Sequence, residues 1–279
     1  MKLGTFLRIS DIKDAQSKFD NLKSSGFEAC QLVYKPDVYK KEDAEIIKSA
    51  AQNSGIDISA MFCGYNDTDT IWDNYYGFMT AGLGVEAYRK SRIDYVKSAV
   101  EFAHEAGIVD VIIHGGYIPN NPFSAEYAPL LSSINTLCKH CKKFGMNLLL
   151  ETGAESSVAL LRVIEDTGAD NLFINLDPAN MLMYGYANPV DSLDTIGKYV
   201  RNIHGKDGLP PTSAKFLGKE TAVGEGKVDF YNMLKELKKL GYNRYIIIER
   251  EIFDNDEKQN EDIMKAKSFF DKLLKDLEF

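Results

Sequence analysis

The feature of this sequence that most limits its fold is a regular alternation between short apolar segments and longer amphipathic ones. The apolar segments have the length and character of buried strands, and the longer segments have the spacing of outer helices. The predicted strands span residues 2–7, 27–34, 57–63, 109–114, 147–151, 172–176, 200–204 and 245–249. The predicted helices span residues 11–24, 42–53, 85–106, 125–144, 157–167, 191–199, 230–240 and 261–277. This alternation predicts a single α/β domain over residues 1–279, a closed (β/α)8 TIM barrel.

Four consecutive strands end on side chains that can ligate a metal ion. Glu151 ends the fifth strand, Asp177 follows the sixth, His204 ends the seventh and Glu249 ends the eighth. A solvated strand end would explain any one of these residues, but not the same placement in four successive units. Because the carboxyl ends of barrel strands meet at one mouth, where active sites of this fold lie, we expect the four side chains to converge.

The chemistry of these four groups favours a bound divalent cation. Carboxylate oxygens and an imidazole nitrogen suit Mn, Mg, Co or Zn, and the absence of cysteine from the set argues against a structural zinc site. Three carboxylates with a neutral imidazole carry a net charge of −3, which one divalent cation reduces to −1. Without a cation the carboxylates would repel one another and some would stay protonated. The sequence therefore predicts an enzyme with one divalent metal ion at the barrel mouth.

Short motifs surround these residues along the chain. They are Leu150-Glu151-Thr152, Asp177-Pro-Ala-Asn180, His204-Gly-Lys206-Asp207, Gly224-Glu-Gly-Lys-Val-Asp229, Ile248-Glu249 and, after the fourth strand, His114-Gly-Gly. Together they resemble the xylose-isomerase-like TIM-barrel superfamily of sugar phosphate isomerases, epimerases and related enzymes, over essentially the whole chain. The resemblance implies that Glu151, Asp177, His204 and Glu249 bind one divalent cation, with Mn as the first choice. It also implies that Glu151 and Glu249 move protons.

The expected reaction begins with removal of a proton. To move a carbonyl along a sugar, or to invert the neighbouring carbon, a proton must leave a carbon α to the carbonyl, and the resulting enediolate is anionic and needs a cation. Strands five and eight are separated around the ring, so Glu151 and Glu249 can flank a substrate, one as base and the other as acid. We therefore expect a metal-dependent isomerase or epimerase of a sugar, sugar phosphate or polyol. The same first step can instead expel a β-hydroxyl, which would make the protein a dehydratase of a keto-polyol.

Three further residues are candidates for substrate binding. His114 ends the fourth strand, where it either faces the substrate or makes a structural hydrogen bond. Asn180 stands where the epimerase branch often has a histidine, and its amide can bind a hydroxyl but cannot shuttle protons. Lys206, placed as in relatives that resemble inosose dehydratases, could bind a hydroxyl, carboxylate or phosphate, or form a surface ion pair with Asp207. Gln31 stands where relatives frequently have a glutamate, and we assign it no catalytic role.

Two other functions remain open. One is that of the apurinic-site endonucleases, which share this barrel but need a polynuclear metal cluster with several more histidines. The chain has four histidines, and His104 and His140 fall on predicted outer helices, so this function is disfavoured. The other is a binding barrel without catalysis, which full metal occupancy without activity would support.

Charge and composition narrow the partners and the compartment. A net charge of −8 disfavours nucleic acid, and the resemblance implies a small-molecule carbohydrate or polyol and self-association into a homo-oligomer. Lys206, Lys215 and Lys219 leave a phosphorylated substrate open, although no glycine-rich phosphate loop supports it. The sequence shows no signal-peptide pattern, no apolar run of membrane-spanning length and only four cysteines, so we expect a cytoplasmic protein that does not bind membranes.

One long segment interrupts the alternation of strands and helices. Residues 64–84 mix polar side chains such as Asn66 and Asp67 with aromatic ones such as Trp72 and Tyr75. Long loops of this kind are usually functional or mobile. We expect the segment to act as a lid over the barrel mouth.

Overall fold

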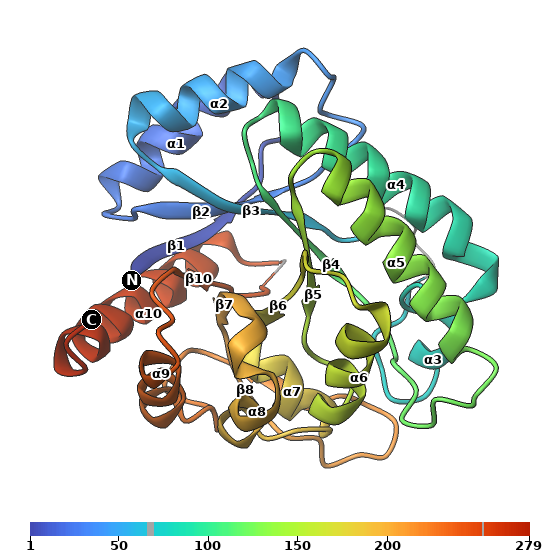
Figure 1. Cartoon of the computed structure of the whole chain (residues 1–279). Helices are drawn as coiled ribbons and strands as arrows, with labels where there is room; N and C mark the ends of the chain where they lie inside the picture. The colour runs from blue at the N-terminus through green and yellow to red at the C-terminus, as the bar shows by residue number, and fades with distance from the viewer. Residues whose placement is uncertain (66–69, 253) are drawn as a thin grey trace.

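The computed structural model describes residues 1–65, 70–252 and 254–279, and its centre is a closed parallel barrel with helices around it (Figure 1). The strands are hydrogen-bonded in the order β1-β10-β7-β6-β5-β4-β3-β2. Their bounds are β1 Lys2–Leu7, β2 Ala29–Val33, β3 Asp57–Cys63, β4 Asp110–His114, β5 Asn147–Glu151, β6 Leu172–Leu176, β7 Val200–Gly205 and β10 Tyr245–Ile248. The predicted (β/α)8 barrel is confirmed.

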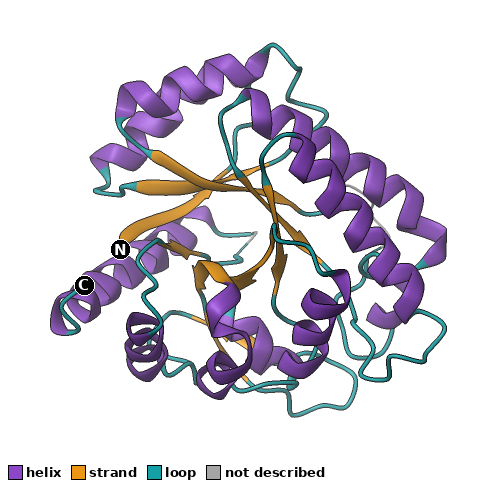
Figure 2. Cartoon of the chain, viewed as in Figure 1, coloured by secondary structure: helices purple, strands orange, loops and turns teal. Residues whose placement is uncertain are grey.

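The long helices lie outside the strands, as Figure 2 shows. Their bounds are α1 Ala15–Ser24, α2 Asp43–Ser54, α4 Glu86–Glu105, α5 Tyr127–Lys143, α6 Ser157–Thr167, α8 Pro189–Ile196, α9 Phe230–Lys239 and α10 Asp256–Asp276. Buried apolar side chains of the strands and helices form the main core between the two layers. Among the described residues, no helix has the length and apolar character needed to cross a membrane.

The largest differences from the predicted elements lie in three parts of the fold. A short helix, α7 Pro178–Tyr184, follows β6 directly, and an antiparallel hairpin of β8 Asp207–Leu209 and β9 Lys219–Thr221 follows β7. The last helix, α10, begins at Asp256 rather than at residue 261, because the Asn255 side chain caps it by accepting from the Lys258 N–H. The two short insertions lie at the barrel mouth, so they add to the site rather than to the core.

Alternation along the strands decides which side chains enter the barrel. Ala60, Ile112 and Leu149, from β3, β4 and β5, form a small buried cluster of their own, against which Phe62 packs. Because side chains alternate between the two faces of a strand, every second residue beyond this layer also points inward. Glu151 lies two residues after Leu149, and its carboxylate therefore belongs to the interior of the mouth.

The predicted lid is described only in part, since residues 66–69 lie outside the described ranges. From residue 70 onward, the segment includes the one-turn helix α3 Gly77–Thr80 and contacts several neighbouring parts of the chain. Arg92 of α4, which is 1% exposed, donates to the Thr80 carbonyl at 2.7 Å. The Asn74 N–H donates to the Lys215 carbonyl in the β8–β9 connection at 2.9 Å. The segment is thus attached to α4 and to the hairpin, and its role as a lid stays a prediction.

A buried carboxylate ties three strands together at the opposite end of the barrel. Asp110, at the start of β4, is fully buried and accepts from Arg201 Nε at 2.9 and 3.0 Å. It also accepts from Arg244 at 2.8 Å and from Asn147 Nδ2 at 2.7 Å. These partners come from β7, from the turn before β10 and from β5. One side chain therefore joins non-adjacent strands at the amino-terminal face, which in this fold serves stability rather than chemistry.

Replacing Asp110 with alanine should lower the free energy of unfolding by about 2 to 4 kcal/mol, measured by urea denaturation. The loss arises because Arg201 and Arg244 would keep their charges in a partly buried place without an anion. Asp170→Ala is the matched control, because its carboxylate is 71% exposed and pairs with Lys142 at the surface, so stability should change little. Equal losses in the two variants would contradict the role of Asp110.

Candidate functional site

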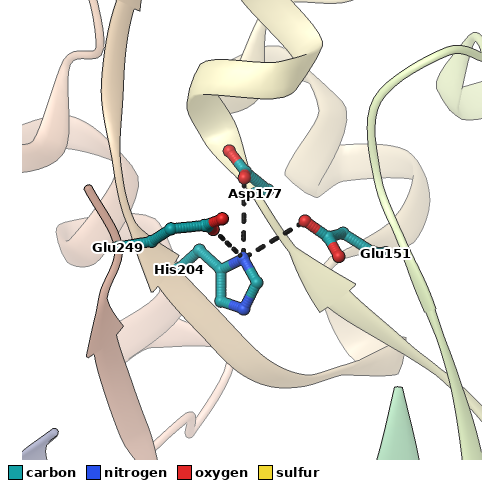
Figure 3. Close-up of side chains that lie close together, drawn as sticks. All are labelled: Glu151, Asp177, His204 and Glu249. Atoms are coloured by element: carbon teal, nitrogen blue, oxygen red, sulfur yellow. Dashed lines mark ion pairs between the residues drawn. The ribbon is translucent and has the colours of Figure 1, made fainter. Parts of the chain in front are cut away.

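Four side chains from the ends of consecutive strands meet at the barrel mouth. They are Glu151, Asp177, His204 and Glu249, the four predicted metal ligands, and one ligand atom from each lies within 4.8 Å of all the others. All four residues are buried. Figure 3 shows the three carboxylates pointing toward one nitrogen of the His204 ring. The expected convergence of these side chains is therefore present in the structure.

The two nitrogens of the His204 ring have different neighbours. Its Nδ1 lies 2.8 Å from Glu249 Oε2, 3.3 Å from Glu151 Oε1 and 3.5 Å from Asp177 Oδ2. Its Nε2 lies 3.0 Å from the Gln31 side-chain amide and 3.1 Å from that of Asn175. Side-chain amides thus hold the far edge of the ring, so Nδ1 is the atom directed at the carboxylates.

The amides behind the ring form a network that the sequence analysis missed. Asn202 donates from Nδ2 to Gln31 Oε1 at 3.1 Å and to Asn175 Oδ1 at 2.7 Å. Gln31, Asn175 and Asn202 are each at most 1% exposed. We predicted no catalytic role for Gln31. In the structure, its side-chain amide contacts the His204 ring and helps to position it. These three residues occupy inward-facing positions of β2, β6 and β7. The alternation of side chains along each strand is the sequence signal that could have identified them.

Local structure orients the Asp177 carboxylate. The Thr152 hydroxyl bonds the backbone of Asp177 on both sides, accepting from its N–H at 2.8 Å and donating to its carbonyl at 2.9 Å. Asp177 Oδ1 caps α7 by accepting from the Asn180 N–H at 2.8 Å, and Pro178 occupies the first turn, where its missing N–H costs nothing. One oxygen is thus committed to the helix, and Oδ2 is directed toward His204.

The donor set fits a divalent cation. Glu151 Oε2, Asp177 Oδ2 and Glu249 Oε2 are buried oxygens without a hydrogen-bond partner among the described residues. Buried carboxylate oxygens are normally paired, and one ring N–H cannot serve several of them. Oxygen atoms with one imidazole nitrogen are the ligands that Mn, Mg, Co and Zn accept. These residues could therefore hold a metal ion at the point where the four side chains meet.

Lys206 is buried among acids rather than at the surface. It is 3% exposed, and its Nζ lies 2.7 Å from Glu251 Oε2 and 3.3 Å from Glu249 Oε1. Burial would raise the pKa of Glu249, but the charges of Lys206 and His204 hold it below its usual value. The ammonium group therefore keeps Glu249 ionised.

The suggested surface ion pair between Lys206 and Asp207 is wrong, because Asp207 is used elsewhere. Its carboxylate is 1% exposed and accepts from four backbone N–H groups. They belong to Gly208, Gly224, Gly226 and Val228, at 2.8 to 3.0 Å. A Cβ on Gly226 would lie 2.0 Å from Asp207 Oδ1, so only glycine allows this approach. Asp207 therefore shapes the loop before α9 and leaves Lys206 to the acids of the mouth.

A cavity of about 350 Å³ is lined by Glu151 and Glu249, two of the four converging residues. The predicted substrate-binding residues His114, Asn180 and Lys206 all line it. His114 Nδ1 lies 3.5 Å from Glu151 Oε2, and Asn180 Nδ2 donates to Glu151 Oε1 at 3.2 Å. Trp72, from the predicted lid, packs with its ring centre 4.7 Å from that of His114. Polar groups beside aromatic walls suit a small polyhydroxylated ligand.

The remaining histidines and lysines of interest lie away from the four converging residues or have other partners. His104 and His140 are on the outer helices α4 and α5, as predicted. Lys215 Nζ lies over the rings of Tyr75 and Tyr76, 5.2 Å from each centre. Lys206 is paired with acids, and the exposed Lys219 lies on β9. These lysine positions lend no support to a phosphate site.

The cavity also contains a carboxyl group that the sequence analysis did not single out. Glu155 lies four residues after Glu151, lines the cavity and is 6% exposed. Burial raises the pKa of Glu155 to about 8, although the N–H of Gly153 lowers it in part. Nothing in the local sequence distinguishes this glutamate from a solvated loop residue, so its burial could only come from the structure.

Comparison with known proteins connects this architecture to one family. A family model described as the xylose isomerase-like TIM barrel matches residues 19–273. The crystal structure of a xylose isomerase domain protein from Planctomyces limnophilus has 30% identical residues and a TM-score of 0.90, and the match covers 99% of this chain and 98% of that one. A D-tagatose 3-epimerase-like protein has the same fold, with 19% identity, a TM-score of 0.74 and coverage of 100% and 98%.

Curated relatives are more distant and match over part of their length. An uncharacterized protein of Methanocaldococcus jannaschii is 26% identical over 202 residues, which are 68% of this chain and 64% of that protein. The chain thus spans less than two thirds of that relative. The inosose dehydratase of Geobacillus kaustophilus is 25% identical over 214 residues, which are 64% of this chain and 69% of the enzyme.

Binding of Mn²⁺ to the metal-free protein should release protons. Burial alone would lower the pKa of His204, but the charges of Glu249 and Glu151 raise it well above its usual value. A raised pKa means that the ring holds its proton at neutral pH, and this proton must leave before the ring binds a cation. The affinity for Mn²⁺ should therefore increase as the pH rises from 6 to 8.

Calorimetric titrations in two buffers with different ionisation heats measure this proton release. His104→Gln is the control, because His104 is exposed on α4 and its loss should leave the released protons unchanged. His204→Gln should weaken Mn²⁺ binding and abolish most of the pH dependence. An Mn²⁺ affinity that does not change with pH in the unmodified protein would count against His204 as a ligand.

Proposed function

The chain belongs to the xylose isomerase-like TIM barrel family, and we propose that it is a divalent-metal-dependent isomerase or epimerase of a sugar or polyol. The observation that carries the proposal is the set of three buried carboxylates with unpartnered oxygens around His204 Nδ1, two of which, Glu151 and Glu249, line a cavity. The volume of about 350 Å³ is at the small end of ligand cavities, which suits a monosaccharide.

In the proposed reaction, Glu151 and Glu249 move a proton on a carbon next to the substrate carbonyl. Glu151 ends β5 and Glu249 directly follows β10, and these strands are separated in the barrel by β6 and β7, so the two carboxylates approach a bound substrate from different sides. Lys206 keeps Glu249 ionised, as a base requires, while Glu151 is contacted by His114 and Asn180. A bound divalent cation would supply stabilisation of negative charge developing on the substrate oxygens.

The metal and its neighbours are part of the same proposal. Glu151, Asp177, His204 and Glu249 would hold one ion, and Mn is our first choice, with Mg, Co and Zn as alternatives. A solved structure of the same fold, from Mycobacterium smegmatis, is described as a complex with magnesium. His114 and Asn180 would bind substrate hydroxyls, and Lys206 would act mainly through Glu249. A homo-oligomeric state and a cytoplasmic location stay predictions.

A metal-dependent dehydratase is the second candidate. It is favoured by the similarity to the inosose dehydratase of Geobacillus kaustophilus. One of the same two glutamates would remove the α-proton, and the other would give a proton to the β-hydroxyl, which would leave as water. Sugar epimerases are frequent among the structures that share the fold, including a D-psicose 3-epimerase and an L-ribulose 3-epimerase, but their identities of 16% and 17% support the fold alone.

The first test is incubation of the Mn²⁺-loaded protein with ketoses and keto-cyclitols in deuterated water, followed by NMR. Deuterium at one α-carbon together with a new sugar signal is expected for an isomerase or epimerase. Loss of a hydroxyl with a new enone would instead establish the dehydratase. Removal of the metal with EDTA should abolish either reaction and lower the melting temperature, since a ligand that binds only the folded state stabilises it.

Glu249→Gln should reduce exchange at the substrate α-carbon by roughly a hundredfold or more, because an amide cannot accept the proton. The variant should keep most of its fold and bind Mn²⁺ more weakly, so exchange is measured at saturating Mn²⁺. Glu257→Gln, an exposed position on α10, is the control and should exchange at the unmodified rate. Persistence of full exchange in Glu249→Gln would show that the assigned role of Glu249 is wrong.

A further inference from the structure

Glu155 has the location of a ligand-binding residue without being one of the four proposed metal ligands. It lies in the loop after β5, immediately before Ser156, which caps α6 by accepting from the Ala159 N–H. The side chain lines the same cavity as Glu151 and Glu249 and is 6% exposed. The loop therefore brings to the cavity a carboxyl group that is separate from the four proposed metal ligands.

The hydrogen bonding of Glu155 is incomplete. Its Oε1 accepts from the Gly153 N–H at 3.0 Å. Within the described residues, this N–H is the one hydrogen-bond donor to the Glu155 carboxyl, and the groups that act on its pKa include no lysine, arginine or histidine. Buried carboxyl groups without a cation destabilise a fold and are concentrated at functional sites. A purely structural role would need only Oε1, so Oε2 is available to a ligand.

The loop backbone is shaped to allow this placement. A Cβ on Gly153 would lie 3.3 Å from both the Asn180 Cβ and the Tyr184 ring, which is tighter than ordinary packing. Glycine at this position therefore lets the loop lie directly against α7. Glu155 lines the cavity together with Asn180 and Tyr184, and Phe6, Phe62 and Trp72 are among its other aromatic lining residues.

We propose that Glu155 is a specificity-determining residue that binds a hydroxyl group of the substrate through Oε2, away from the reacting carbons. A sugar hydroxyl both donates and accepts, so it can pair with a carboxyl group in either protonation state. This contact would decide which face of the sugar, and hence which carbon, is presented to Glu151 and Glu249. The inference rests on the proposed sugar chemistry, and it adds a group that selects among substrates.

The test combines protein variants with substrate analogues that lack single hydroxyls. Binding of D-fructose and of its monodeoxy analogues to the Mn²⁺-loaded protein is measured by calorimetry, which requires no turnover. In the unmodified protein, one analogue should bind about tenfold more weakly than D-fructose, as the loss of one hydrogen bond implies. In Glu155→Ala, the difference in affinity between D-fructose and that same analogue should fall below about twofold.

Further variants separate ligand binding from structural support. Glu155→Gln keeps the shape and can still accept from Gly153, so its Mn²⁺ affinity and melting temperature should match those of the unmodified protein. Glu165→Gln, exposed on α6, is the matched control and should leave every sugar affinity unchanged. If Glu155→Ala weakens D-fructose and all its analogues to the same extent, the hydroxyl contact is refuted.

The outcomes also distinguish this inference from the proposed reaction. Suppose that the affinity difference between D-fructose and the deoxy analogue disappears in Glu155→Ala, and that the unmodified protein shows no deuterium exchange. This result would support the contact and refute the reaction. Deuterium exchange with an unchanged analogue difference would refute the contact alone. Failure of the Mn²⁺-loaded protein to bind D-fructose or any analogue would refute the contact for ketohexoses.

Discussion

The site depends on the compensation of buried negative charge. Three carboxylates face one imidazole nitrogen, and each has an oxygen that no hydrogen bond satisfies among the described residues. Such a cluster is costly in a protein interior unless protons, basic side chains or a cation balance it. Lys206 supplies part of the balance through Glu249. A divalent ion would supply the rest, and its binding is thus linked to the protonation of His204.

The barrel makes this concentration of charge possible. Parallel strands place their carboxyl ends on one face, and alternation along each strand sends every second side chain inward. Residues separated by many positions in sequence, such as Glu151 and Glu249, thereby meet around His204. The opposite face carries Asp110 with its two arginine partners, which join strands and stay away from the cavity. Stability and binding are therefore assigned to different ends of the same strands.

Much of the fold and the four converging side chains could be predicted because they follow from local periodicity and from the geometry of parallel strands. The elements that were missed, α7 and the β8–β9 hairpin, are short and lack a periodic pattern long enough to recognise. The partner of Lys206 was also predicted wrongly, because Glu251 lies 45 residues away and only the closed ring brings it within 2.7 Å. Glu155 shows the same limit, since burial of a loop carboxyl depends on α7 packing against Gly153.

Charge around the cavity also bears on what the protein can bind. The ammonium of Lys206 is held by Glu249 and Glu251, and Arg250 is held by Glu220 at 2.7 Å and Asp262 at 3.0 Å. Cations that are tied to acids in this way have little attraction left for a phosphate group. Carboxyl and amide groups that line the cavity match hydroxyls, and the exposed Arg8 also lines it, with its guanidinium 5.2 Å from the centre of the Phe6 ring. Lys206 and Arg250 are therefore already paired with acids, whereas Arg8 is the cation at the mouth that no ion pair holds among the described residues.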